Sequence, residues 1–150
     1  MSSPSLDPIF HLPMPPVNAV FNTAAGNIFT AIYAGGVLVI LLWAIFHNRD
    51  TLRALAMLLG GAAVSLFEPL FDLLTAVWHP PVGQTPFFTS FGREIPLWVS
   101  VAYAAYYGGV GYLTLGALLR GASMRAIWLW ALVPIVFDEI IEEAMLHFDL

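Results

Sequence analysis

The run Gly61-Ala-Ala-Val-Ser-Leu-Phe-Glu-Pro-Leu-Phe-Asp72 places two carboxyl groups inside an apolar segment that extends over Ala54–Trp78. A segment of about 20 apolar residues crosses the hydrocarbon core of a bilayer as a helix. An ionised side chain at the centre of such a helix costs about 2.5 to 3.5 kcal/mol. Acids at the positions of Glu68 and Asp72 therefore indicate a function rather than an accident of composition.

Three further segments have the same apolar character, namely Ala24–Phe46, Pro96–Leu119 and Ala126–His147. Of the 150 residues, 59% are hydrophobic and 10% are charged, whereas about 25% are charged in an ordinary globular domain. The sequence predicts an all-α fold, an integral membrane bundle of about four transmembrane helices. We expect one domain over residues 1–150, with a short Pro-rich N-terminal segment at residues 1–22.

The arginines predict the orientation of the bundle. Four of the five cationic side chains lie in two short connections, residues 47–53 and 120–125. Loops rich in Arg and Lys stay in the cytoplasm, so we expect these two loops to be cytoplasmic in a multi-pass plasma membrane protein. The fifth, Arg93, lies in the long, aromatic-rich connection Pro80–Ile95, which is either a lid over a site or an interfacial anchor.

Polar side chains gather at one depth of the predicted bundle. In the second segment a spacing of four, three, four, three and four residues draws one line down a helix face, formed by Gly61, Ser65, Glu68, Asp72, Thr75 and His79. Weaker polar stripes on the first and third segments comprise Thr23, Asn27 and Thr30, and Ser100, Tyr103 and Tyr107. The fourth segment carries four acids on one arc, Asp138, Glu139, Glu142 and Glu143. We expect an acidic chamber in the outer half of the bundle and a dry cytoplasmic half.

Two local features refine this picture. Pro69 removes a backbone donor directly after Glu68, so a kink is predicted there.

The order of a Tyr-x-Gly-Gly-Val motif, two arginines and a Phe-acid pair occurs in both halves of the chain, beginning at Tyr33 and at Tyr106. This order fits a duplicated helical hairpin with facing carboxylate pairs; chance similarity between apolar segments is the alternative.

Paired carboxyl groups in a low-dielectric site repel each other when both are ionised, so one of each pair is expected to keep its proton. A protonated acid can deliver a proton to an alkene or epoxide, while a second carboxylate removes another proton. The candidate catalytic residues are Glu68, Asp72, Asp138 and Glu142. The candidate substrate-binding residues are Asn27, Tyr103, Tyr107, Trp78, Glu139 and Arg93.

In its number of helices and its buried acids, the sequence resembles the sterol isomerases that include emopamil-binding protein, and the small membrane-bound terpene cyclases. The resemblance covers the architecture of the four segments and no specific motif. It implies an isomerase or cyclase without a cofactor, acting on a terpenoid- or sterol-like substrate. The expected partners are membrane lipids and a lipophilic small molecule, with no nucleic acid.

Other functions use the same acids. A proton-coupled transporter of this length would work as a homo-oligomer, and an assembly or lipid-binding subunit would pair its acids with a partner. A metal site could use the carboxylates with His79 or His147, but the sequence has no Glu-x-x-His or His-Glu-x-x-His motif, so no metal is predicted. The chain has no cysteine and no lysine, which excludes thiol redox chemistry and a Schiff-base cofactor.

Overall fold

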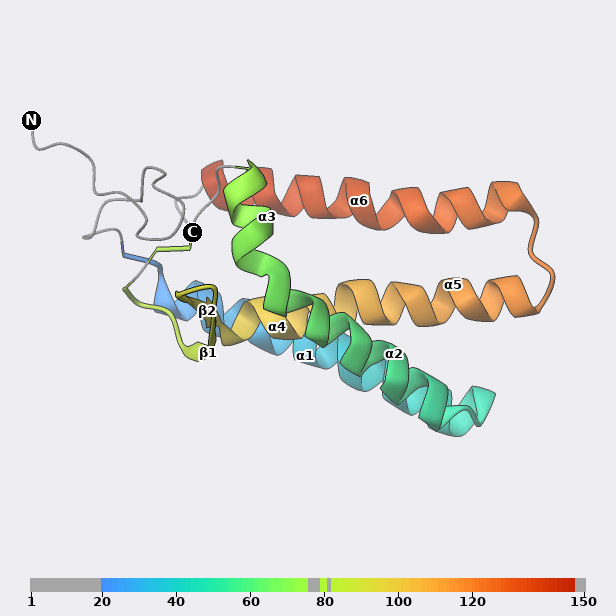
Figure 1. Ribbon diagram of the computed structural model, residues 1–150. Coiled ribbons are helices and arrows are strands. Elements are labelled where there is room, and N and C mark those ends of the chain that lie inside the picture. Colours follow the sequence, from blue (N-terminus) through green and yellow to red (C-terminus); the bar gives the residue numbers. More distant parts are fainter. Residues whose placement is uncertain (1–19, 76–78, 81, 148–150) are drawn as a thin grey trace, which may run out of the picture.

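A computed structural model describes residues 20–75, 79–80 and 82–147, and four helical rods make up most of this part of the chain (Figure 1). The first rod comprises α1 (Thr23–Trp43) and a π-helical turn, η1 (Ala44–Asn48). The second comprises α2 (Thr51–Val64), a 3-10 turn, η2 (Ser65–Phe67), and α3 (Glu68–Thr75). The third comprises α4 (Leu97–Tyr103), a π-helical turn, η3 (Ala104–Gly109), and α5 (Val110–Leu119). The fourth is α6 (Met124–His147).

The prediction of an all-α fold is wrong in one place, the connection before the third rod. Strands β1 (Pro86–Ser90) and β2 (Arg93–Pro96) pair there as an antiparallel hairpin. Phe91 and Gly92 both have positive φ, 47° and 77°, which is the two-residue turn that matches the twist of a hairpin. The Ser90 hydroxyl donates to the carbonyl of Leu66 and holds the hairpin against η2.

The predicted kink beside Pro69 is confirmed. Because proline has no N–H, the α-helical hydrogen bond to the carbonyl of Ser65 cannot form. The chain tightens into the 3-10 turn η2, and the backbone N–H of Glu68 donates to that carbonyl instead. As a result α3 leaves the axis of α2 at a sharp angle (Figure 1).

The closest packing in the bundle is between α2 and η3. A Cβ atom added to Gly61 would lie 2.4 Å from the backbone nitrogen of Gly108, and one added to Gly108 would lie 2.6 Å from the Cα atom of Leu58. Only glycine allows two helix backbones to approach this closely. The first rod packs along α4 and η3, and the main neighbour of α6 is α5.

The arrangement of the described helices is not that of two equivalent hairpins. In a duplicated hairpin, a two-fold axis would exchange the first rod with the third and the second with α6. The contact between the first rod and α6 would then match the contact between α2 and η3. The contact between α2 and η3 is extensive, whereas the first rod and α6 form no comparable contact among the described residues. The packing therefore gives no support to the predicted duplication.

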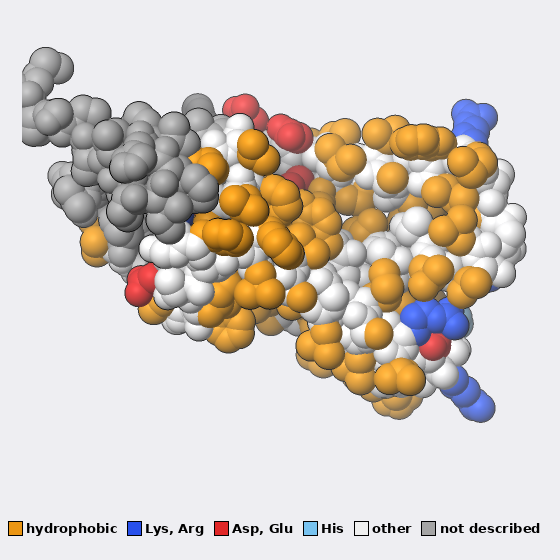
Figure 2. Space-filling view, in the orientation of Figure 1, with side chains coloured by type: hydrophobic (Ala, Val, Ile, Leu, Met, Phe, Trp, Pro, Cys, Tyr) orange, Lys and Arg blue, Asp and Glu red, His pale blue; other side chains and the backbone are white. Residues whose placement is uncertain are grey.

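Within the described residues, two helices are long and apolar enough to cross a membrane, Thr23–Asn48 and Thr51–Leu74. Only 6% of the apolar window in the first and 28% of that in the second are buried inside the molecule. Figure 2 shows apolar side chains spread over the visible face. Arginines gather at the end that carries the loop between the first and second rods and the loop between α5 and α6. Exposed apolar surface of this extent is typically covered by lipid or by partner helices.

Candidate acid–base site

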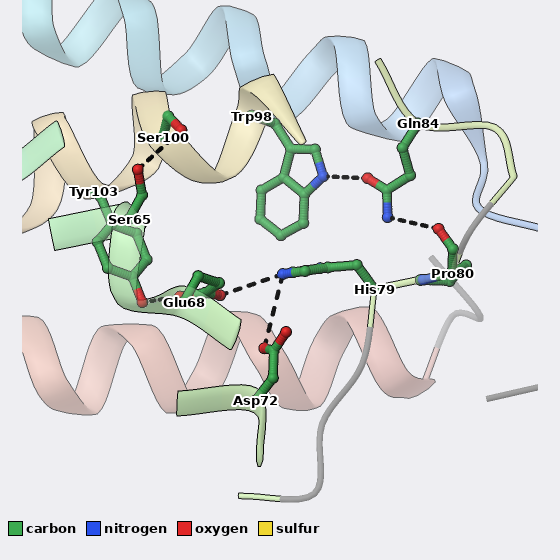
Figure 3. Close-up of polar contacts among 9 residues, drawn as sticks. All are labelled: Ser65, Glu68, Asp72, His79, Pro80, Gln84, Trp98, Ser100 and Tyr103. Atoms are coloured by element: carbon green, nitrogen blue, oxygen red, sulfur yellow. Dashed lines mark hydrogen bonds and ion pairs between the residues drawn. The ribbon is translucent and has the colours of Figure 1, made fainter. Parts of the chain in front are cut away.

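Glu68, the first residue of α3, is the centre of a buried polar network (Figure 3). Its Oε2 accepts a hydrogen bond from the hydroxyl of Tyr103 at the end of α4. Its Oε1 lies 3.2 Å from Nε2 of His79. The kink at η2, which Pro69 causes, directs the carboxyl group of Glu68 toward these partners.

Asp72 lies one helical turn beyond Glu68 and is 5% exposed. Its Oδ1 is 3.9 Å from the same Nε2 atom of His79. One oxygen from each carboxylate and one imidazole nitrogen all lie within 4.8 Å of one another. The imidazole therefore stands between two acids, but it comes from the loop outside α3 and not from the helix face on which the spacing placed it.

His79 is held by a chain of contacts from the loop and from α4. The Trp98 ring meets the imidazole edge-on, with ring centroids 5.5 Å apart. The indole Nε1 of Trp98 donates to Oε1 of Gln84 over 2.6 Å, and Nε2 of Gln84 donates to the carbonyl of Pro80 over 3.4 Å (Figure 3). Sequence reasoning missed Gln84, because a single amide in a Pro-rich connection gives no periodic signal.

The loop that carries His79 is fastened to the start of α1. The Phe21 N–H donates to the carbonyl of Val82 over 2.8 Å, and the Thr23 hydroxyl donates to the carbonyl of Gly83 over 2.8 Å. Gly83 has a φ of 88°, and a Cβ atom there would lie 2.3 Å from the carbonyl oxygen of Phe21. The polar stripe predicted near Thr23 thus anchors the loop.

Tightly packed side chains of η2, β2 and α4 support the polar network around Glu68. Ser65 and Ser100, which the sequence placed on facing polar stripes, share a hydrogen bond of 3.0 Å between their hydroxyl oxygens. Ser65 also belongs, with Pro69, Ile95 and Val99, to the largest fully buried side chains of the described part of the chain. This packing fixes the kink and the start of α4, and with them Glu68 and Tyr103.

Two further predicted residues border the network. The ring of Tyr107 lies 4.8 Å from that of Tyr103 and is 48% exposed, so it connects the buried site with the outer surface. Arg93 on β2 is close enough to Asp72 for a coulombic attraction between guanidinium and carboxylate. The connection that the sequence marked as a lid or an anchor thereby brings a cation to the site.

The remaining predicted residues are divided. Asp138 on α6 is half-buried and close enough to Glu68 for coulombic repulsion, whereas Glu139 is exposed. Asn27 lines a small cavity of about 10 Å³ together with Trp98 and Gln84, and no carboxylate lines that cavity. Trp78 and the side chain of Glu142 lie outside the described residues. The site is therefore built mainly on the second and third rods, with Asp138 approaching from the fourth.

The arrangement can hold and move protons. Tyr103, Glu68, His79 and Asp72 follow one another at contact distances, and each can both bind and release a proton. The two carboxylates with the imidazole are also a donor set that divalent metals accept. Both kinds of chemistry are open to these residues on geometry alone.

Comparison with protein-family models, with curated proteins and with solved structures finds no match for this chain. No family is identified by these comparisons, so the resemblance to membrane isomerases and cyclases stays a prediction. A functional conclusion has to come from the site.

Proposed function

We propose that this protein is a membrane-embedded acid–base enzyme, an isomerase or cyclase acting on a lipophilic, terpenoid- or sterol-like substrate. In this proposal the four rods cross the bilayer and the substrate arrives from the lipid. The observation that carries the proposal is the buried pair Glu68 and Asp72 with the imidazole of His79 between them. An imidazole in contact with two acids can pass a proton from one to the other, which a single ion pair cannot do.

The two carboxyl groups have complementary roles. In this cycle Glu68 starts with its proton and delivers it to an alkene or epoxide. The Tyr103 hydroxyl donates to Oε2 of Glu68 and stabilises the carboxylate that forms. Asp72 removes a different proton from the resulting cation. The substrate is rearranged without gain or loss of atoms, and the enzyme is left with the proton on Asp72.

His79 returns the enzyme to its starting state. Its Nε2 is 3.2 Å from Glu68 and 3.9 Å from Asp72, so it can take the proton from Asp72 and pass it to Glu68 after small side-chain motions. The aromatic faces of Trp98, Tyr103 and Tyr107 supply the negative quadrupoles that stabilise a carbocation. The half-exposed Tyr107 marks the side from which an apolar substrate would enter.

The test uses purified protein with a panel of isoprenoid alkenes, isoprenoid epoxides and sterols, and seeks products of unchanged mass by gas chromatography and mass spectrometry. We expect Glu68→Gln to lower the rate about 10²- to 10⁴-fold, the usual contribution of a positioned acid. Glu94→Gln is the matched control, because Glu94 is an exposed acid on β2. Equal activity of Glu68→Gln and wild type would remove the proposal.

A second candidate, a divalent-metal centre, is favoured by the three potential ligand atoms within 4.8 Å contributed by Glu68, Asp72 and His79. A metal bound there would supply Lewis-acid chemistry in place of the carboxylic proton. The acid–base proposal expects turnover to survive dialysis against a chelator. Loss of activity on dialysis, restored by one divalent ion per chain and abolished with metal binding in His79→Ala, would favour the metal centre instead.

A further inference from the structure

A cavity of about 450 Å³ lies at the opposite end of the bundle from the carboxylates, between the loop after η1 and the end of α5. The sequence predicted this cytoplasmic half to be dry, and the cavity is the correction to that expectation. Ligand sites have volumes of about 300 to 1,000 Å³. Its lining brings together three arginines: Arg49 at the end of η1, Arg53 in the first turn of α2 and Arg120 at the end of α5.

The charge of the cavity is only partly neutralised. Arg53 forms an ion pair of 2.9 Å with Asp50, the one acid in the lining. Arg49 and Arg120 have no carboxylate partner in the described part of the chain. A cavity with one carboxylate among three guanidinium groups is a site for an anion with more than one negative oxygen.

Local backbone geometry prepares this arrangement. Arg49 adopts a left-handed conformation, with a φ of 52°, where it ends η1. Asp50 makes no capping hydrogen bond to the first turn of α2, and its carboxylate is turned to Arg53 instead. The first-turn N–H groups, which favour anions, are thus left without that side-chain cap.

On the α5 side of the cavity, Gly116 leaves room for the guanidinium of Arg120. A Cβ atom on Gly116 would lie 3.3 Å from a terminal nitrogen of Arg120, so the absence of a side chain at this position lets the guanidinium lie against α5. Tyr112 is 3% exposed, and its hydroxyl accepts a 2.9 Å hydrogen bond from the side-chain amide of Asn48. This bond ties the floor of the cavity to the end of η1.

We propose that this cavity binds a phosphate group, carried by an anionic lipid headgroup or by a soluble phosphate ester. Guanidinium groups bind phosphate oxygens in pairs, and basic pockets between membrane helices on the cytoplasmic side bind lipid headgroups. At the end of α5, Leu118 and Leu119 are exposed, and Leu119 also lines the cavity, so an apolar chain next to the phosphate would find apolar side chains there. The site is separate from the carboxylate network and does not depend on the function proposed for it.

Two measurements on the full chain in neutral detergent distinguish the sources of the phosphate. Native mass spectrometry compares the retention of phosphatidylglycerol with that of phosphatidylcholine. Thermal unfolding at constant ionic strength measures the response to inorganic phosphate. The variants are Arg49→Gln, Arg120→Gln and Gly116→Ala, and the matched control is Arg125→Gln, an exposed arginine in the first turn of α6 that does not line the cavity.

We expect each cavity arginine variant to weaken binding about fivefold, and Gly116→Ala to weaken it without any change in charge, while Arg125→Gln binds as wild type. Selective retention of phosphatidylglycerol assigns the site to a lipid. A response to inorganic phosphate alone assigns it to a soluble ester. Equal effects of Arg125→Gln and Arg120→Gln in both measurements, or no binding of either probe by wild type, would overturn the proposal.

Discussion

Among single residues, the neighbours of Glu68 decide how its carboxyl group is held. Tyr103 donates to one carboxylate oxygen and His79 contacts the other, so the acid is held in one orientation. Among the described residues, Asp72 shares His79 with Glu68 and lies near Arg93. The two carboxyl groups thus occupy different environments, which is how two acids in one site acquire different roles.

The role of His79 as a proton carrier gives a kinetic prediction. In His79→Gln the first turnover should occur at nearly the wild-type rate, because Glu68 still begins with its proton. Steady-state turnover should fall at least about 10²-fold, because the proton left on Asp72 no longer returns. Rapid-quench measurement of a single turnover and of later turnovers separates the two, with His47→Gln, an exposed histidine, as control. A first turnover slowed as much as the steady state would contradict this role.

At the scale of the elements, interruptions of helical geometry do most to place the site. The turn η2 redirects the chain so that Glu68 faces α4, and the π-helical turn η3 begins directly after Tyr103. Single π-helical turns inside α-helices occur frequently at functional sites. Behind both, the contact between Gly61 and Gly108 holds α2 against η3.

This contact gives a stability prediction with a neighbouring control. A methyl group at Gly61 would meet the backbone of Gly108, whereas one at Gly60 would meet nothing within 4 Å. We expect Gly61→Ala to destabilise the fold by about 1 to 3 kcal/mol through overpacking. Gly60→Ala should be neutral or slightly stabilising, because alanine is the better helix former. Thermal unfolding in detergent measures both, and equal unfolding temperatures would mean that the two helices do not approach so closely.

The parts of the site that repeat along a helix were predictable from the sequence, and the parts that depend on irregular backbone were not. The spacing predicted that Glu68 and Asp72 share a helix face, and Pro69 predicted the kink, whereas His79 reaches the two acids from the loop outside α3. The hairpin turn at Phe91 and Gly92 and the contact of Gln84 with Trp98 depend on how a loop folds back in three dimensions. No periodicity in the sequence reports such contacts.

At the scale of the whole molecule, charge and polarity are separated along the bundle axis. Arginines gather at the end with the two short loops (Figure 2), and the carboxylate network lies toward the hairpin end. Apolar side chains are exposed along α6 on several of its faces, including Trp128, Leu132 and Ile140. A bundle with this distribution fits a bilayer with its arginine end in the cytoplasm.

The orientation can be tested directly because the chain contains no cysteine. Thr89→Cys places one thiol on the hairpin, and Ser123→Cys places one in the loop between α5 and α6, both at exposed positions. In intact cells we expect a membrane-impermeant maleimide to label Thr89→Cys, and to label Ser123→Cys only after the membrane is opened. The reverse pattern, or labelling of both variants in intact cells, would contradict the proposed topology.

The central claim is that Glu68 gives a proton to a lipophilic substrate, and a single turnover in D₂O tests it most directly. Enzyme equilibrated in D₂O and present in excess over substrate starts with a deuteron on its exchangeable acid. With an alkene as substrate, we predict a product that carries one deuterium at the newly protonated carbon, and at least about 10²-fold slower product formation by Glu68→Gln. A product without deuterium from the wild-type enzyme, or a labelled product from Glu68→Gln at the same rate, would contradict the account.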